Sequence, residues 1–264
     1  MKSSVQSGLL FGRRQELARL TAAIRERRSL LIFGPPDSGK SSLVDQALTS
    51  LPGNLASRCL RVKAEGSLQR ILQQHVIRLF AAKDTVVQDA FSLRAREFHS
   101  VESWVKKQTS GRLRSLLFRA FDNGRYWVLW DNVGQLGLGH YHFLREVIWM
   151  RKTPVYLLAR GLGYEYLGQA TRLFWSDEWR IELGPLAPED ARALLEAAIE
   201  REGLTNLDLS EFHEQVLEAS RCLPGAIVRM VAMAGQPQYQ YGNRVKTKLI
   251  HMDYLIQLAS RVQI

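Results

Sequence analysis

The amino-acid sequence predicts an α/β fold, with a parallel sheet in a three-layer arrangement followed by a small helical lid. Short and almost wholly apolar runs, such as 126–130 and 154–159, alternate with amphipathic segments over the first two thirds of the chain. Such runs are typical of strands that a parallel sheet buries on both faces. After Gly184-Pro185 only helical patterns remain. We therefore expect an α/β domain over residues 1–184 and a C-terminal helical lid domain over residues 185–264.

The order of elements follows from the spacing of apolar residues. Apolar positions three or four apart predict helices, and alternating or continuous apolar runs predict strands. Helices are expected over 10–28, 42–51, 67–82, 100–121 and 141–150. Strands are expected over 29–33, 57–64, 126–130, 154–159 and 180–183. Proline and acidic residues in Ala187-Pro188-Glu189-Asp190 then favour the start of a helix running to about Glu202, and two or three more helices complete the chain.

Composition restricts the class of protein. An apolar fraction of 46% in 264 residues is ample for a core, and the two cysteines, Cys59 and Cys222, form no disulfide framework or metal set. No apolar run approaches the ~20 residues that span a bilayer, and no secretory signal begins the chain, so we expect no membrane partner and a cytoplasmic location. The net charge of +10 favours anionic partners such as nucleic acid without establishing one.

One motif carries most of the chemistry. Residues 34–41 fit the pattern G-x-x-x-x-G-K-[ST], between an apolar run and a helical segment. Its glycines let backbone N–H groups face a triphosphate, Lys40 can reach the β- and γ-phosphates, and Ser41 can ligate Mg²⁺. The candidate phosphate-binding residues are Gly34, Pro35, Pro36, Asp37, Ser38, Gly39, Lys40, Ser41 and Ser42.

A second candidate site residue follows the apolar run 126–130. Such a phosphate loop needs a carboxylate at the end of a neighbouring strand to hold the Mg²⁺ shell, and Asp131 is that candidate. The next residue is Asn132, whose amide can position a water molecule but cannot accept its proton. Hydrolysis is therefore expected to be slow, or to take its base from elsewhere, with Glu146 and Glu165 as candidates that also suit ordinary surface acids.

Over roughly residues 10–260 the chain resembles the AAA+/STAND-type P-loop ATPases of the additional-strand class. Five landmarks carry the resemblance in the correct order: Phe11-Gly12-Arg13-Arg14-Gln15-Glu16-Leu17 ahead of the first strand, Gly34–Ser41 as Walker A, Tyr126–Asp131 as Walker B, Val155–Arg160 as the sensor strand, and Leu183–Ala191 at the start of the lid. The resemblance implies a P-loop NTPase domain with a helical lid, ATP or ADP with Mg²⁺ as ligands, and nucleotide bound between sheet and lid.

The same resemblance implies roles for single residues. Phe11 would border the adenine, and Arg160 would read the γ-phosphate, so that Lys40, Asp131, Asn132 and Arg160 form the catalytic set. Arg229 would act as a second sensor, one turn after Cys222-Leu223-Pro224-Gly225, which resembles the G-x-P stretch of STAND lids with a cysteine in place of the first glycine. Arg172 would be an arginine finger in a homo-oligomer. Each arginine is equally compatible with a solvated surface position.

Basic clusters raise the question of nucleic acid. They are Arg25–Arg28, Arg94–Arg96, Lys106-Lys107 with Arg112 and Arg114, and Arg244–Lys248. Trp104 and Phe118 lie near the third cluster, where they can either stack bases or belong to the core. The pair His140 and His142 is expected in an exposed loop rather than in a metal site.

Three hypotheses follow. The first is an ATP-binding switch with Mg²⁺-dependent ATP hydrolysis to ADP and phosphate that is slow because of Asn132, its effector being a separate protein. The second is a DNA-associated AAA+ ATPase that oligomerises on DNA. The third is a nucleotide-binding scaffold without turnover.

Overall fold

A computed structural model describes residues 10–161 and 163–262. Packing groups them into two units, which we call the sheet unit and the helical unit. The sheet unit comprises Gln15–Gly34 and Val44–Glu182. The helical unit comprises the described residues up to Arg14, the segment Pro35–Leu43, and the described chain from Leu183 onward. Residues 35–41 of the phosphate-loop motif therefore group with the C-terminal helices, and the domain boundary expected near residue 184 stays a prediction.

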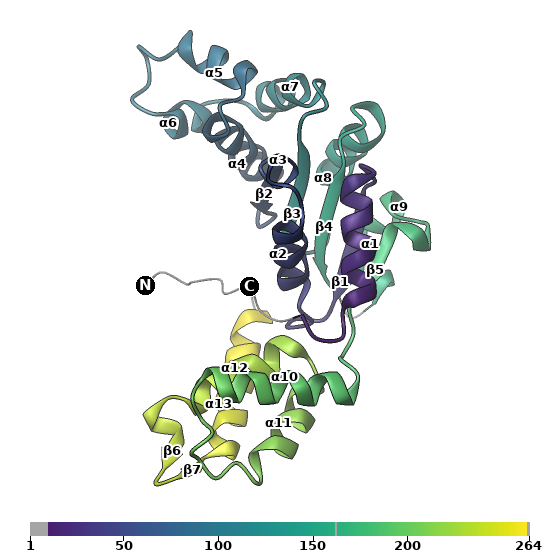
Figure 1. Cartoon of the computed structure of the whole chain (residues 1–264). Coiled ribbons are helices and arrows are strands. Elements are labelled where there is room, and N and C mark those ends of the chain that lie inside the picture. Colours follow the sequence, from purple (N-terminus) through teal and green to yellow (C-terminus); the bar gives the residue numbers. More distant parts are fainter. Residues whose placement is uncertain (1–9, 162, 263–264) are drawn as a thin grey trace. The chain divides into compact units, whose positions relative to one another are not determined.

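The sheet unit contains the predicted parallel sheet (Figure 1). Its strands are β1 (Leu30–Gly34), β2 (Cys59–Lys63), β3 (Trp127–Val133), β4 (Val155–Arg160) and β5 (Arg180–Glu182). They lie in the order β2-β3-β4-β1-β5, and every pair is parallel. The α/β fold class predicted from the sequence is confirmed. All five residues of β1 are buried, as expected for a strand with covered faces.

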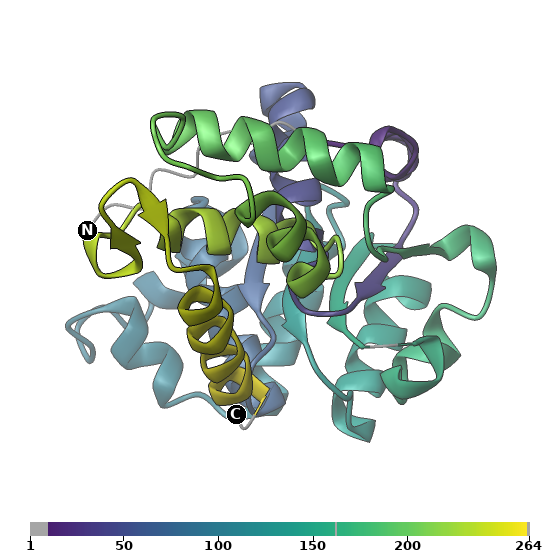
Figure 2. The ribbon, with the colours of Figure 1, turned by 90° about the horizontal axis from the view of Figure 1, so that it is seen from below.

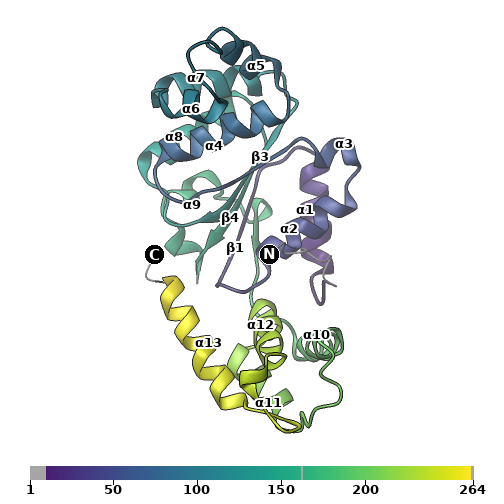
Figure 3. The same cartoon turned by 90° about the vertical axis from the view of Figure 1, so that its left-hand side faces the viewer.

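Helices cover both faces of this sheet. Figure 3 shows them on opposite sides of the strands. On one side lie α1 (Arg14–Arg25), α2 (Lys40–Ser50) and α3 (Gly53–Ala56), and on the other α4 (Leu68–Ala81), α7 (Ser110–Phe121) and α8 (Leu138–Arg145). Tyr156 on β4 donates a hydrogen bond to the carbonyl of Ala23 at 3.1 Å, which fixes α1 to the first face. Side chains alternate between the two faces along each strand, so successive residues of β3 and β4 face opposite helical layers.

Several expected boundaries were wrong. The helix expected over 100–121 is two helices, α6 (Val101–Lys106) and α7, because the Thr109 hydroxyl caps a new helix by accepting from the Arg112 amide. A further helix, α5 (Thr85–Ser92), begins at Asp84, whose carboxylate caps it. The segment expected as a helix over 141–150 is the end of α8 followed by a π-helical turn, Glu146–Met150. His140 and His142 lie on α8 rather than in a loop.

The helical unit has its own core. Its helices are α10 (Pro188–Arg201), α11 (Phe212–Ser220), α12 (Pro224–Ala234) and α13 (Thr247–Val262), coloured green to yellow in Figure 2. Buried residues such as Leu195, Phe212 and Met230 form one cluster between them. The expectation of helices alone after residue 184 was wrong in one detail, since β6 (Gln240–Tyr241) and β7 (Arg244–Val245) form an antiparallel hairpin. Gly242 has a φ of +60° at its turn, a conformation that glycine tolerates without strain.

Within residues 10–161 and 163–262, no helix is both long and apolar enough to cross a bilayer.

His75 on α4 lies completely buried against the other face of the sheet. The indole of Trp130 donates a 2.7 Å hydrogen bond to its Nε2 atom. Burial lowers the pKa of His75 to about 3, so the folded protein holds this ring neutral. A proton on Nε2 would also cost the bond from Trp130. In the unfolded chain the pKa is about 6.5, so this stability is fully present above about pH 6.5 and is lost as the pH falls towards 3.

We therefore expect the free energy of unfolding to be lower at pH 5 than at pH 7, by roughly 2 kcal/mol from His75 alone. Urea titrations at both pH values measure it. His75→Gln, which can still accept from Trp130, should flatten the dependence by about that amount. His142→Gln, a change at an exposed position of α8, should leave it as in the wild type. Equal pH dependence in the His75 variant and the wild type would contradict the expectation.

Candidate functional site

The phosphate-loop motif has the local structure that its sequence predicted. Strand β1 ends at Gly34, and α2 begins at Lys40. Between them Asp37 and Gly39 have φ values of +64° and +90°, and the Ser38 amide donates to the carbonyl of Pro35. A side chain at Gly39 would be strained at this φ, which explains the glycine. The strand–loop–helix context required for a P-loop is present.

Lys40 is buried within its own loop. Its ammonium donates to the carbonyl of Pro35 at 2.8 Å and to the Ser38 hydroxyl at 3.1 Å. Ser41 and Ser42 are exposed on the first turn of α2. An ammonium group held by loop oxygens beside exposed hydroxyls is an arrangement that can exchange these contacts for phosphate oxygens. The described loop thus has the donors that a polyphosphate requires.

Asp37 connects this loop to the C-terminal helices within the helical unit. Arg229 on α12 forms an ion pair with Asp37 Oδ1 at 2.6 Å, and the Tyr254 hydroxyl on α13 donates to Oδ2 at 3.2 Å. The Gly225 amide donates to the Asp37 carbonyl at 2.8 Å. We call Asp37, Gly225, Arg229 and Tyr254 the Asp37 clamp. The family resemblance implied a nucleotide-sensor role for Arg229, with a solvated surface position as the alternative. The structure places its guanidinium against a residue of the phosphate loop.

The segment ahead of α1 also packs in the helical unit. The buried guanidinium of Arg13 donates to the carbonyl of Gly184, and Phe11 is half-buried. Gly12 has a φ of +61°, and a Cβ atom there would lie 2.5 Å from the Asp190 carboxylate. The Phe11–Leu17 box thus meets the start of α10 through Gly12 and Arg13. The contact of Phe11 with adenine stays a prediction.

Asp131 lies in the sheet unit, inside β3 rather than after it. The strand was expected to end at Trp130 but continues to Val133. Its pairing with β4 shifts by one residue between Trp130 and Val133, and Asn132 has a φ of +63°. This is a β-bulge, a device that bends a strand and redirects its side chains. The bulge contains Asp131 and Asn132, the two residues on which the Walker B hypothesis depends.

Sequence reasoning missed the partner of Asp131. Arg61 on β2 donates through Nη2 to Asp131 Oδ2 at 2.5 Å and forms an ion pair with Asp45 on α2 at 2.5 Å. Burial alone would lower the pKa of Arg61, but its bonds and charge interactions with the two carboxylates outweigh burial and raise it. Because Arg61 pairs with Leu129 in the strand register, it is a diagonal neighbour of Asp131 on one face. Only strand pairing could reveal this contact.

The side-chain oxygens of Asp131 and Ser41 are of the kind that Mg²⁺ prefers as ligands. The side chain of Asp131 is 18% exposed, and Ser41 presents a hydroxyl. Mg²⁺ prefers hard oxygen ligands and is commonly held by one or two protein groups together with substrate phosphates. Within the described residues no group of three or more His, Cys, Asp or Glu could form a dedicated metal cage. The roles of Ser41 and Asp131 as Mg²⁺ ligands stay predictions.

The remaining site candidates lie in the sheet unit. Arg160 ends β4 and is exposed, and Arg172 is exposed on α9 (Ala170–Leu173). Glu146 binds Arg114 at 3.3 Å and Arg151 at 3.5 Å, so it has a structural role as an ion-pair partner. Glu165 is exposed in the short 3-10 helix Tyr164–Leu167. Catalytic roles for these residues stay predictions.

The basic clusters are partly neutralised. Each has one cation paired with an acid: Arg28 with Glu26, Arg94 with Glu97, Arg114 with Glu146, and Arg244 with Asp208. Trp104 is 1% exposed and Phe118 is 9% exposed, so both belong to the core rather than to a base-stacking surface.

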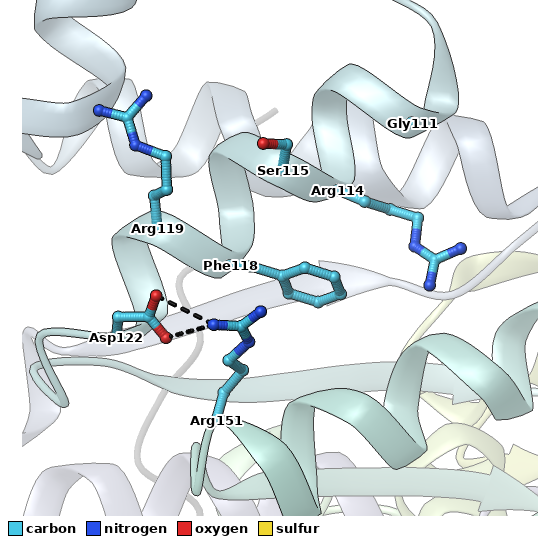
Figure 4. Close-up of a pocket in the computed structure, with 7 residues that line it drawn as sticks. All are labelled: Gly111, Arg114, Ser115, Phe118, Arg119, Asp122 and Arg151. Atoms are coloured by element: carbon cyan, nitrogen blue, oxygen red, sulfur yellow. Dashed lines mark hydrogen bonds and ion pairs between the residues drawn. The ribbon is translucent and has the colours of Figure 1, made fainter.

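A hollow of about 350 Å³ lies on α7, and its lining residues are drawn in Figure 4. The guanidinium of Arg151 lies there 4.9 Å from the centre of the Phe118 ring. Arg151 also donates twice to Asp122, at 2.9 and 3.1 Å. Arg119 lines the same hollow and forms no ion pair with a described residue. Arg119 is thus a cation in this hollow that no described acid neutralises, and such groups can contact phosphate.

The phosphate loop on a parallel sheet defines a P-loop ATPase fold. The sequence profile of the AAA ATPase domain family matches residues 9–217, and the protein belongs to this family. A Walker-type ATPase of Pyrococcus abyssi has a similar structure, with a TM-score of 0.56 and 15% identity, over 96% of this chain and 76% of that chain.

A signal transduction ATPase with numerous domains (STAND) from Pyrococcus horikoshii, which has a tetratricopeptide repeat sensor, is similar at a TM-score of 0.49 and 15% identity. That match covers 90% of this chain and 31% of that chain. None of the curated protein sequences is similar enough to count as a relative. The match to the AAA ATPase domain family over residues 9–217 confirms the expected resemblance to AAA-type P-loop ATPases. Gly225, Arg229 and Tyr254 lie after residue 217, outside the matched region.

Proposed function

We propose that this protein is an ATP-dependent switch, in which the nucleotide bound to the phosphate loop controls the C-terminal helices through the Asp37 clamp. Lys40 and the loop amides hold the phosphates, with Phe11 beside the adenine. Ser41 and Asp131 hold Mg²⁺, which neutralises charge on the phosphates, and Arg160 senses the γ-phosphate. The single observation that carries the proposal is the ion pair between Asp37 and Arg229, because it joins a loop residue to α12 directly.

The clamp can respond to the γ-phosphate through charge. Arg229 Nη1 is buried and has no hydrogen-bond partner among the described residues, so this arginine has a donor beyond those that Asp37 uses. A triphosphate competes with Asp37 for the guanidinium and also repels the carboxylate. Charge-assisted hydrogen bonds contribute about 1.5–3 kcal/mol each. Exchange of one such bond is enough to change the population of a two-state element severalfold.

Hydrogen exchange tests the switch. The Gly225 amide donates to Asp37, so opening of the clamp removes its protection. We expect the amides around Gly225 and Tyr254 to exchange at least severalfold faster with Mg·ATP than with Mg·ADP. Asp37→Asn should reduce this difference because it removes the charge that holds Arg229. Asp89→Asn, an exposed change on α5, should preserve it. Identical exchange in the two nucleotides would refute the switch.

Binding of DNA is the second candidate function. The observations that favour it are the net charge of +10 and the unbalanced Arg119 in the hollow on α7. Phosphate contacts need only such cations, and their affinity would fall steeply with salt. Fluorescence anisotropy with duplex DNA at low salt, with and without ATP, separates this candidate from a switch that acts on a protein effector. Self-assembly through Arg172 stays a further proposal that light scattering with each nucleotide tests.

A further inference from the structure

Asn132 leaves the ATPase without an obvious base. It follows Asp131 directly, and its amide cannot take a proton from the attacking water. Glu146 is bound to two arginines, which leaves it poorly suited to the role. A carboxylate near Asn132 that the chain brings from a distant segment would remove this difficulty.

Glu65 is such a carboxylate. It follows β2, whose last residue Lys63 pairs with Asp131 in the strand register. The ladder continues one step further, because the Ala64 amide donates to the Asp131 carbonyl at 2.8 Å. Glu65 therefore leaves the sheet beside Asp131, at the carboxyl edge where ligands of parallel α/β sheets bind.

A direct hydrogen bond joins Glu65 to Asn132. The Asn132 amide nitrogen donates to Glu65 Oε1 across a separation of 67 residues. The bulge in β3 and the positive φ of Asn132 accompany this contact. Asparagine adopts such a φ more readily than most residues do. The backbone irregularity at Asn132 thus coincides with an acidic partner from the segment that follows the neighbouring strand.

The remaining atoms of the pair suit the positioning of a water molecule. Asn132 Oδ1 is buried and accepts no hydrogen bond from a described residue, an arrangement that costs about 1–3 kcal/mol. Glu65 is exposed and forms no ion pair within residues 10–161 and 163–262, so its charge is not neutralised by a neighbour. Glu65 Oε1 accepts from Asn132, which leaves the second oxygen of this exposed carboxylate to accept from a water molecule.

We propose that Glu65 is the general base for ATP hydrolysis, with Asn132 as the residue that positions Glu65. This inference rests on the proposed binding of Mg·ATP at the phosphate loop. Glu65 accepts a proton from the water as the water oxygen forms a bond to the γ-phosphorus. The bond from the γ-phosphorus to the bridging oxygen breaks, and ADP leaves with that electron pair. Glu65 then returns the proton to solvent. The acid that other ATPases carry after the Walker B aspartate is thus supplied by the segment that follows β2.

Steady-state phosphate release and bound-nucleotide content test the proposal together. Glu65→Gln keeps an acceptor for the Asn132 amide but cannot take a proton. We expect its turnover to fall about 10²–10⁴-fold, the range for loss of a general base, while its ATP affinity by calorimetry stays within about twofold. Incubated with ATP and desalted, the variant should retain ATP where the wild type retains ADP. Glu65→Asp, which keeps a carboxylate, should have an intermediate rate.

Glu102→Gln on α6 is the matched control, because it removes an exposed carboxylate from the same unit. Its turnover should equal that of the wild type. Turnover of Glu65→Gln within about twofold of the wild type would overturn the inference, and so would a wild-type rate at background. Neither result bears on the proposed switch, because the switch is tested by the difference in hydrogen exchange between ATP and ADP, which does not depend on turnover. Loss of ATP binding in the wild type would instead refute the proposed function itself.

Discussion

Replacement of Lys40 by alanine is expected to abolish ATP binding measured by calorimetry. The ammonium group is buried in the loop and is the cation that the motif provides for the β- and γ-phosphates. Loss of a charge-assisted contact of about 3 kcal/mol weakens binding by roughly 100-fold. Removal of the charge beside a polyphosphate adds to that loss.

Replacement of Lys40 can also change the stability of the protein without nucleotide, because Lys40 donates to Pro35 and Ser38. A second variant controls for this effect. Lys40→Met keeps most of the side-chain volume and should lose ATP binding equally, while its melting temperature without nucleotide stays near that of the wild type. Lys106→Ala, at an exposed position of α6, should bind ATP normally. Unchanged affinity in both Lys40 variants would remove the phosphate-loop assignment and with it the proposed function.

Gly225→Ala is expected to break the Asp37 clamp. A Cβ atom at Gly225 would lie 2.9 Å from Cβ of Asp37 and 3.0 Å from its Cα and carbonyl oxygen, so loop and helix cannot both keep their places. Added methyl groups in such tight contacts cost about 1–3 kcal/mol. We expect the free energy of unfolding to fall by that amount. The difference in hydrogen exchange between ATP and ADP should disappear.

Gly111→Ala is the matched substitution. Gly111 lies in the first turns of α7, where a Cβ atom would meet nothing within 4 Å. Alanine favours a helix over glycine by up to about 1 kcal/mol, so this variant should be equally or more stable. If the two alanine variants behaved alike, the contact between α12 and the loop would have no energetic consequence, and the clamp would not couple them.

Much of the sheet unit was predictable from local patterns. The apolar runs that became β1, β3 and β4 are long enough to exclude solvent on both faces, and their composition alone distinguished them from surface strands. Errors fell where capping side chains decide the boundary, at Thr109 and Asp84, or where the helix changes to a π-turn after Arg145. These features depend on single hydrogen bonds that periodicity does not record.

The candidate site was predictable only where it is contiguous. Residues 34–41 form one short segment, so their order fixes their geometry as well as their chemistry. Arg61 and Glu65 gave no signal, because their contacts with Asp131 and Asn132 arise from the pairing of β2 with β3. A strand register shifted by a single residue would turn these side chains to the other face.

The sequence by itself determined the fold class, the phosphate loop and the acidic residue on β3, since each depends on neighbours along the chain. The tertiary structure decided what those groups touch. It placed Asp37 against Arg229 and Tyr254, 192 and 217 residues away, and Asn132 against Glu65. The physical reason is that ion pairs and hydrogen bonds act over a few ångströms in space, and only the folded packing brings such distant segments within that range.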